Sequence, residues 1–372
     1  MGAFNGSIVA ASYKNVVVGT IGSHSALEIC AGARAEGLKN IVLCQKGREK
    51  TYDVHYKSSR GLGCIDETMV LHKFSEMANP FIVKVLQSMN VVFVPNRSFS
   101  VYVGYDNIEQ KFRVPIFGNR SLLRAEERNE KKNQLWLLQK AGVRFPRAFK
   151  GASEIDRLAI VKVSEAKRKY ERAFFLCSSE KEYSNESKKL LKSGVIDKAG
   201  LDAAVIEEFV IGAQFNFNFF VSPLSGRLEL LGIDMRRQTN LDGFLRMPAP
   251  QQLEALKRVR VNNIEVGHVA CTLRESLLEK VFEAGEKFAA TCKEEYAPGL
   301  IGPFALQGAI VPEKDSEEIV IFDVSFRVPG SPGIAATPYS EYLHGKSIGT
   351  GRRIALELRQ ARDEGKLEKV VT

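Results

Sequence analysis

A strand–helix–strand pattern near the start of the chain restricts the possible folds more than any other feature. A β-branched run at residues 16–21 is followed by an alternating apolar helix over residues 26–36 and by a second apolar run at residues 40–44. Two strands joined by a helix in this way lie parallel in one sheet, with a right-handed crossover. A further apolar run at residues 91–95 predicts that residues 1–115 form a doubly wound α/β domain.

The second half of the chain shows the alternation of an antiparallel sheet. Predicted strands cover residues 204–210, 214–222, 227–235, 303–311 and 318–328, and a helix is predicted over residues 274–296. Phe215 and Phe217 alternate with Asn216 and Asn218, which is the period of a sheet with one packed face. Since 372 residues exceed the roughly 250–300 that one hydrophobic core can serve, we expect two or three packed domains.

The positive charge of the chain is local. Residues 111–172 carry 17 Lys and Arg against 7 Asp and Glu, whereas the whole chain has a net charge of +9. This imbalance favours phosphates or nucleotides as partners. Nucleic acid is disfavoured because aromatic and basic residues do not alternate as in an RNA-binding sheet. Within this stretch, the pattern predicts one helix over residues 121–141.

The six cysteines argue against a zinc site or a disulfide framework, since they are widely spaced and contain no CxxC pair. No apolar run approaches the ~18 residues of a membrane span, and the first residues do not resemble a secretory signal. We therefore expect a cytoplasmic protein with no membrane partner.

Polar residues on the last predicted hairpin could hold a metal and a phosphate. Period-two alternation places Gln307 on one face of the first strand and Asp323 and Arg327 on one face of the second. Two oxygen ligands plus phosphate oxygens suit Mg²⁺, with Mn²⁺ as an alternative ion, and the planar guanidinium of Arg327 suits a phosphate or carboxylate. The alternative interpretation is an exposed sheet face with a simple ion pair.

Two other places have the chemistry of nucleotide binding. Lys162 interrupts an apolar run, where an unpaired charge is costly, and is therefore a candidate phosphate ligand. The second place is the predicted strand and linker at residues 206–210, where one of Glu207 and Glu208 could accept from a ribose hydroxyl and the backbone up to Val210 could bind an adenine edge. His24 precedes a helix whose N-terminus favours an anion, although an ordinary turn residue is the alternative.

Seven motifs occur in a fixed order along the chain: GSHSAL at residues 22–27, GREKTY at 47–52, VPIFGNR at 114–120, IEEFVIG at 206–212, GID at 232–234 with NLDG at 240–243, IGPF at 301–304 and GRRIA at 351–355. This series resembles the archaeal formate-dependent FAICAR synthetases, members of the ATP-grasp superfamily. The resemblance covers nearly the whole chain. It implies an N-terminal α/β domain at residues 1–115, followed by the small and large subdomains of an ATP-grasp fold at residues 116–205 and 206–372.

The resemblance also implies an activity and a set of site residues. The family joins formate to the amine of aminoimidazole carboxamide ribonucleotide (AICAR), converting ATP to ADP and phosphate through a formyl phosphate. Matched residue by residue, it implies AICAR contacts at His24, Ser98 and Asn240, ATP contacts at Lys162 and Glu208, and metal ligands at Gln307 and Asp323. To these we add Glu207 and Val210 as ATP contacts, Arg327 as the catalytic residue, and a homo-oligomeric assembly.

The chain departs from the family pattern at three places. Residues 164–172 replace a glycine-rich loop over the ATP phosphates and offer Lys167, Arg168, Lys169 and Arg172 instead. Asp323 stands where the family has the longer Glu, and residues 329–333 replace a Gly-Gly-Thr-Asn-like stretch. Two alternatives follow: a paralogue that binds a purine-pathway nucleotide without efficient turnover, or a ligase for a different carboxylate and amine.

Overall fold

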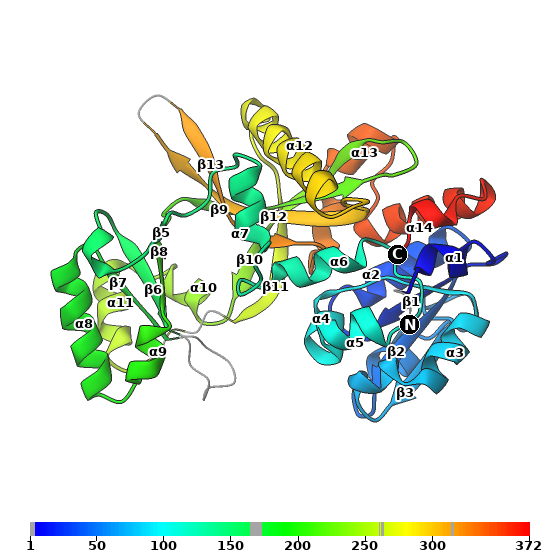
Figure 1. Cartoon of the computed structure of the whole chain (residues 1–372), viewed down its shortest axis with the longest axis horizontal. Coiled ribbons are helices and arrows are strands. Elements are labelled where there is room, and N and C mark those ends of the chain that lie inside the picture. The colour runs from blue at the N-terminus through cyan, green and yellow to red at the C-terminus, as the bar shows by residue number, and fades with distance from the viewer. Residues whose placement is uncertain (1–3, 164–172, 260, 262–263, 314–315) are drawn as a thin grey trace. The chain divides into compact units, whose positions relative to one another are not determined.

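The computed structural model describes residues 4–163, 173–259, 261, 264–313 and 316–372 (Figure 1). The chain divides into two compact units. The large unit comprises residues 1–143, 214–308 and 323–372, and the small unit comprises residues 144–213 and 309–322. The domain boundaries expected at residues 115 and 205 stay a prediction.

A parallel sheet forms the N-terminal part of the large unit. Its strands are β1 (Val17–Ile21), β2 (Lys39–Gln45), β3 (Glu67–Leu71) and β4 (Val91–Phe93), in the order β3-β2-β1-β4. All the neighbouring strands are parallel, which confirms the predicted doubly wound arrangement. Because parallel strands end at the same edge, the loops after β1 and β4 bring His24 and Ser98 to one side of the sheet.

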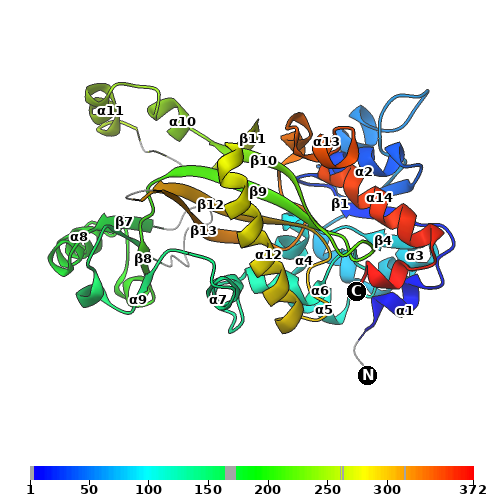
Figure 2. The same cartoon turned by 90° about the horizontal axis from the view of Figure 1, so that it is seen from above.

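Two helices from opposite ends of the chain pack together in the large unit. Helix α2 (Ala26–Ala35) lies beside α14 (Thr350–Asp363) in both views (Figures 1 and 2). A Cβ on Gly32 would lie 2.2 Å from the carbonyl carbon of Gly351, so only glycine permits this approach. The N–H of Gly351 donates to the buried Glu28 carboxylate at 3.1 Å. This long-range contact satisfies a backbone N–H in the first turn of α14 and so contributes to capping that helix.

A five-stranded sheet carries the polar residues of the second half. Its strands are β9 (Ala213–Val221), β10 (Leu228–Gln238), β11 (Glu265–Cys271), β12 (Gly302–Pro312) and β13 (Glu317–Ser325), in the order β11-β10-β9-β12-β13. Helix α12 (Leu278–Glu295) covers one face of the sheet (Figure 2). On that face, Phe219 stacks on Phe304 at 5.2 Å between ring centroids, and Phe288 of α12 lies 6.2 Å from Phe304. The opposite face is left for polar side chains.

The small unit is built on a four-stranded antiparallel sheet. Its strands are β5 (Ala148–Phe149), β6 (Ala159–Val163), β7 (Ala173–Cys177) and β8 (Val205–Glu208), in the order β5-β8-β6-β7. Helices α8 (Glu180–Lys192) and α9 (Lys198–Asp202) belong to the same unit. The predicted phosphate contacts at Lys167, Arg168, Lys169 and Arg172 lie outside the described residues.

The single helix predicted over residues 121–141 is wrong. The structure has α6 (Arg120–Leu123), a 3₁₀ turn (Arg124–Glu126) and, after a non-helical stretch, α7 (Gln134–Lys140). The reason is Asn133, whose side-chain oxygen accepts from the N–H of Leu135 at 2.9 Å while its amide donates to the carbonyl of Glu130 at 2.9 Å. Asn133 therefore caps a new helix and stabilises the turn before it.

The remaining α-helices are short: α1 (Gly6–Ala10), α3 (Pro80–Ser88), α4 (Arg97–Val103), α5 (Tyr105–Gln110), α10 (Leu241–Phe244), α11 (Ala249–Leu256) and α13 (Tyr339–His344). Within the described ranges, no helix has the length and apolar character needed to cross a membrane.

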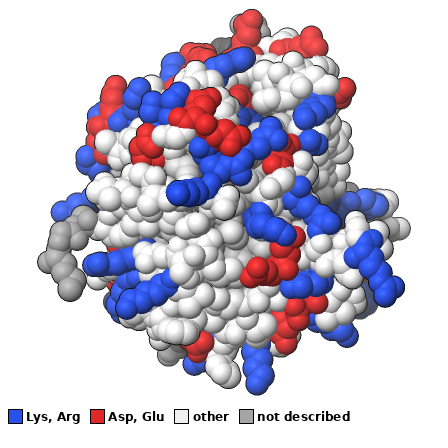
Figure 3. Space-filling model, turned by 90° about the vertical axis from the view of Figure 1, so that its right-hand side faces the viewer, with Lys and Arg blue, Asp and Glu red and all other residues white. Residues whose placement is uncertain are grey.

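On the face of the molecule shown in Figure 3, Lys and Arg side chains are interspersed with Asp and Glu.

Candidate active site

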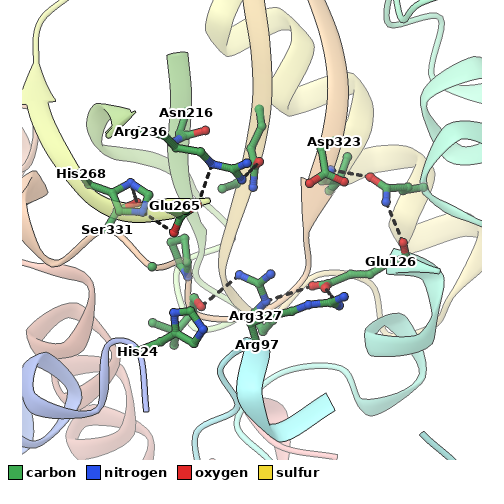
Figure 4. A pocket seen from close by; sticks show the side chains of 17 residues that line it. His24, Arg97, Glu126, Asn216, Arg236, Glu265, His268, Asp323, Arg327 and Ser331 are labelled. Atoms are coloured by element: carbon green, nitrogen blue, oxygen red, sulfur yellow. Dashed lines mark hydrogen bonds and ion pairs between the residues drawn. The ribbon is translucent and has the colours of Figure 1, made fainter. Parts of the chain in front are cut away.

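A cavity of about 310 Å³ lies in the large unit and is lined mainly by charged and polar side chains (Figure 4). Its polar lining consists of His24, Arg97, Glu126, Gln134, Asn216, Arg236, Glu265, His268, Gln307, Asp323, Arg327 and Ser331. These side chains come from the loop after β1, from α4, from the 3₁₀ turn that ends at Glu126, from the start of α7, from the polar face of the five-stranded sheet and from the segment after β13. Such a concentration of charge is expected for a site that binds anionic ligands.

The loop after β1 presents His24 to the cavity. His24 adopts a positive φ of 41°, and Figure 4 marks no hydrogen bond between its ring and the other lining residues that are drawn. Burial and the positive charge of Arg327 lower the pKa of His24, so the imidazole is neutral near neutral pH. A neutral ring with both nitrogens unpaired can donate one hydrogen bond to a ligand and accept another.

Ser98 holds the same loop from the end of β4. The buried Ser98 hydroxyl donates to Ser23 Oγ at 2.8 Å, and Asn96 donates to the Ser23 carbonyl at 2.9 Å. The two polar side chains therefore fix the backbone immediately before His24.

A buried carboxylate, Asp234 of β10, is held by three neighbours. Asn216 and Asn218 of β9 each donate to it at 2.7 Å, and His268 Nδ1 of β11 contacts its Oδ1. Burial alone would raise the pKa of Asp234, but the hydrogen bonds from His268 and the two asparagines lower it below its ordinary value. Asp234 is therefore a fixed negative charge behind the cavity wall.

His268 connects this buried charge with the cavity. Its Nε2 lies 2.9 Å from Glu265 Oε1, so the ring bridges Asp234 and Glu265. Although burial opposes protonation, the two carboxylates raise the pKa of His268 to about 9, and the ring is a cation near neutral pH. Glu265 in turn pairs with Arg236, whose Nε lies 3.0 Å from Glu265 Oε2.

The two predicted metal ligands lie on the same wall. The Gln307 amide donates to Ser325 Oγ at 3.1 Å and its oxygen accepts from the Arg236 guanidinium. Asp323 also lines the cavity. A carboxylate and an amide oxygen fit a hard cation such as Mg²⁺. Because the described residues contain no group of three or more His, Cys, Asp or Glu that could hold a metal, such an ion would take its other ligands from phosphate or water.

Two arginines share one carboxylate at the base of the cavity. Arg97 donates to Glu126 Oε2 at 2.9 Å, and Arg327 Nε lies 3.3 Å from Glu126 Oε1. The N–H of Phe326 also donates to Glu126 at 2.9 Å, which anchors the carboxylate. Arg97 also lies 3.5 Å from Glu127 Oε1, so two arginines face two carboxylates here, and the planar guanidinium groups can exchange these partners for an anionic ligand.

The structure thus gathers four of the predicted site residues, His24, Gln307, Asp323 and Arg327, around one cavity. Ser98 stands behind His24 and contacts the same loop. Asn240 precedes α10 and is not part of the cavity lining. The other predicted residues belong to the small unit.

In the small unit, the predicted ATP contacts have protein partners. Lys162 Nζ forms an ion pair with the buried Glu207 carboxylate. Glu208 accepts from the N–H of Arg147 at 3.2 Å, and Val210 packs against the apolar cluster of Val311 and Val320. An ATP phosphate would have to draw Lys162 from Glu207. The assignment of these residues to ATP stays a prediction.

Asp234, which lies behind the cavity wall, and the lining residues His268, Glu265 and Arg236 were not predicted from the sequence as site residues. A signal for the first was available, because Asn216 and Asn218 interrupt a phenylalanine-rich strand and Asn216 pairs directly with Asp234 across the sheet. No comparable signal marked His268. It lies on β11, and its contact with Asp234 depends on the register between the strands.

The segment that departs from the family pattern, residues 329–333, is held firmly at the cavity. Ser25 Oγ donates to the Pro329 carbonyl at 2.7 Å, and the buried Ser331 hydroxyl lies 3.4 Å from His268 Nδ1. A Cβ on Gly330 would lie 3.5 Å from His268 Nε2 and 3.6 Å from His24 Nδ1. Pro329, Gly330 and Ser331 of the altered sequence therefore form part of the cavity lining.

Family models match both halves of the chain. One described as a protein of unknown function (DUF1246) matches residues 18–149, and one described as a domain of unknown function (DUF1297) matches residues 182–372. Among solved structures, an IMP biosynthesis protein PurP from Thermococcus kodakaraensis is similar, with a TM-score of 0.71 and 30% identity over 95% of this chain and 100% of that one.

More distant structures show the same fold. An ADP complex of N5-carboxyaminoimidazole ribonucleotide synthetase covers 90% of this chain and 78% of its own, with a TM-score of 0.55 and 14% identity. Phosphoribosylglycinamide synthetase from Anaerococcus prevotii covers 84% of this chain and 68% of its own, with a TM-score of 0.52 and 13% identity. The predicted ATP-grasp fold is confirmed.

Two curated relatives carry the same name, 5-formaminoimidazole-4-carboxamide-1-(beta)-D-ribofuranosyl 5'-monophosphate synthetase. The protein from Methanopyrus kandleri is 39% identical over 96% of both chains. The protein from Methanocaldococcus jannaschii is 36% identical over 96% of this chain and 95% of its own. By these matches over nearly its whole length, the chain belongs to the FAICAR synthetase family.

Proposed function

We propose that this protein is an ATP-dependent ligase that joins formate to the amine of AICAR, giving FAICAR, ADP and phosphate. The observation that carries the proposal is the cavity of the large unit, where His24, Gln307, Asp323 and Arg327 meet. Three of these residues match family positions for nucleotide and metal, and Arg327 supplies a cation for an anionic group. The family membership supports the same reaction.

The reaction requires charge neutralisation more than a covalent nucleophile. A formate oxygen attacks the γ-phosphorus of ATP, ADP leaves, and a formyl phosphate results. The amine then attacks the formyl carbon, the C–O bond to phosphate breaks, and the amine loses a proton. Phosphoryl transfer of this kind depends on positioning and on cations around the phosphate oxygens.

The cavity offers these cations in fixed positions. Arg327 and Arg97 flank Glu126 and would hold the formyl phosphate or the leaving phosphate. Gln307 and Asp323 would hold Mg²⁺, which neutralises phosphate charge when bound. His24, supported by Ser98, would contact the AICAR nucleotide.

The small unit would contribute the ATP contacts. We assign phosphate binding to Lys162, ribose binding to Glu207 or Glu208, and adenine binding to the backbone near Val210. Since Lys162 already pairs with Glu207, ATP binding would exchange one anionic partner for another. The protein is further expected to be a cytoplasmic homo-oligomer, because closed homo-oligomers are common among such enzymes.

The test is ADP release by the full chain with ATP, Mg²⁺, formate and AICAR, omitting each component in turn. We expect release that requires all four, and its loss in His24→Ala. Bound AICAR without ADP release would contradict the ligase and favour a nucleotide-binding paralogue. ADP release that ignores formate would indicate a different carboxylate.

A further inference from the structure

Arg236 forms a hydrogen bond with the Gln307 amide oxygen, the atom that would bind the metal ion in the proposed function. Its guanidinium donates to the amide oxygen of Gln307, and its Nε pairs with Glu265. The amide orientation is fixed because the Gln307 nitrogen donates to Ser325 Oγ at 3.1 Å. The Gln307 oxygen therefore points toward Arg236, and a simple flip of the amide would lose the bond to Ser325.

We propose that Arg236 is a positioning residue that competes with the divalent cation for the Gln307 amide oxygen and thereby lowers the cation's affinity. This inference rests on the proposed function only in taking Gln307 and Asp323 as the cation ligands. If the guanidinium donates a hydrogen bond to the same oxygen that coordinates a divalent ion, the two positive charges lie close together and repel each other strongly. Binding of the ion therefore requires Arg236 to leave Gln307.

The cavity wall provides a place for Arg236 when it leaves. Glu265 holds Arg236 by a second contact, at 3.0 Å, which does not involve Gln307. His268 anchors the other oxygen of Glu265 at 2.9 Å, and Asp234 anchors His268. The contacts that link Asp234, His268 and Glu265 thus keep Arg236 near the site, both when it contacts Gln307 and when it has left it.

The charges around the site predict that removing Arg236 raises the affinity for the divalent cation. Arg236 is a positive charge beside the ion's site, and it also neutralises Glu265. Removing the guanidinium would free the Gln307 oxygen and leave the Glu265 carboxylate with a single cationic partner, His268. Both changes favour a divalent cation, so the affinity should rise.

The experiment measures Mn²⁺ binding to the full chain in the presence of ADP, by electron paramagnetic resonance. The variant is Arg236→Met, which keeps much of the side-chain length without the charge. The matched control is Arg237→Met on the same strand, where an exposed arginine pairs with Asp242 at 2.8 Å. Gln307→Ala reports whether Mn²⁺ uses the proposed ligand.

We expect the Mn²⁺ Kd to fall roughly tenfold in Arg236→Met, to stay unchanged in Arg237→Met and to rise in Gln307→Ala. An unchanged or higher Kd in Arg236→Met would overturn the inference. If that variant does not fold, as judged by circular dichroism, Arg236→Lys replaces it: it retains the charge without the planar fork, and a smaller fall in Kd is expected. An unchanged or higher Kd in that variant would equally overturn the inference.

These results are independent of turnover. If the wild type binds Mn²⁺ through Gln307 but releases no ADP with formate and AICAR, the proposed function fails and the competition can still hold. If Gln307→Ala leaves Mn²⁺ binding unchanged, Gln307 is not a ligand, and the inference fails even in an active enzyme.

Discussion

Two clusters of charged side chains in the large unit differ in burial and in whether they face the cavity. In the first, Arg353 of α14 donates to both oxygens of Glu229 at 2.7 and 2.9 Å and to Glu357 at 2.8 Å, and its guanidinium stacks 4.1 Å from the Phe220 ring centroid. In the second, Asp234, His268, Glu265 and Arg236 form a chain that ends at the cavity wall.

The difference shows how to separate stabilising charges from charges that serve a ligand. Arg353, Glu229 and Glu357 are all buried, and each carboxylate is held by several donors. They join the C-terminal helix to the strands β9 and β10. In the second cluster, Arg236 and Glu265 remain about one-third exposed, and a ligand can replace some of their contacts. We therefore expect changes in the first cluster to affect stability and changes at the cavity to affect binding.

The largest effect on stability is expected for Arg353→Met. It leaves Glu229 and Glu357 buried without their main cation, and breaking a buried pair in this way costs about 3–5 kcal/mol. Arg359→Met on the same helix is the control: Arg359 is exposed, and its partner Glu36, although buried, keeps its contact with Arg352 at 2.7 Å, so a loss of at most about 1 kcal/mol is expected. Urea denaturation gives both free energies of unfolding. If Arg353→Met and Arg359→Met lowered the free energy of unfolding equally, the buried cluster around Arg353 would not have the special role in stability that we assign to it.

A cavity-facing cation should show the opposite behaviour. Arg327→Met is expected to lower kcat for ADP release by roughly 10²–10³-fold, the usual effect of losing one preorganised charge-stabilising donor. Its free energy of unfolding should change much less than that of Arg353→Met, since Glu126 keeps Arg97 and the Phe326 N–H. Steady-state kinetics with saturating substrates provides the test. Unaltered kcat would exclude Arg327 from the chemistry.

The pH dependence of stability offers a test of the His268 bridge. The pKa of His268 is raised from 6.5 to about 9, so the folded state binds this proton more tightly than the unfolded state does. Its contribution to stability is complete below pH 6.5 and declines as the pH rises through about 9. Thermal unfolding of the wild type and His268→Gln should show a difference in Tm that narrows over this interval. A constant difference would mean that His268 does not bridge the carboxylates as a cation.

The smallest change in stability is expected for Gly330→Ala. The added methyl would lie 3.5 to 3.6 Å from His268, Glu265 and His24, which is ordinary van der Waals contact, so the free energy of unfolding should change by no more than about 0.5 kcal/mol. The methyl would still narrow the cavity between the two histidines. Calorimetry should therefore show weaker AICAR binding at nearly unchanged Tm; a large drop in Tm would show that the segment tolerates no added volume.

Site residues could be predicted from the sequence where the signal lies within one strand or helix, and not where it depends on contacts between distant segments. Alternation within single strands was sufficient to predict the polar faces that carry Gln307 and Asp323, whereas Ser98 was predicted only from the resemblance to the family. The contact of His268 with Asp234 joins two strands through their register, which no local pattern encodes. The helix over residues 121–141 fails for a related reason: its apolar spacing is helical, but Asn133 has a stronger preference for a cap.

The same reasoning applies to the ends of the fold. In the structure, the last long helix, α14, begins at Thr350, and the N-cap position belongs to Gly349, which has no side chain to accept a hydrogen bond. Glu28, far away in the sequence, supplies the hydrogen-bond acceptor for the first turn. Such a contact requires the packing of α2 against α14 to be known.

The most direct test of the proposed ligase follows the carbon of the carboxylate. The full chain is incubated with ¹³C-formate, AICAR, ATP and Mg²⁺, and the products are examined by carbon NMR. We predict that the label appears as a formamide carbon on the nucleotide, in proportion to the ADP formed, and that His24→Ala reduces both signals together. ADP accumulation with all the label remaining as free formate would contradict the claim that this protein formylates AICAR.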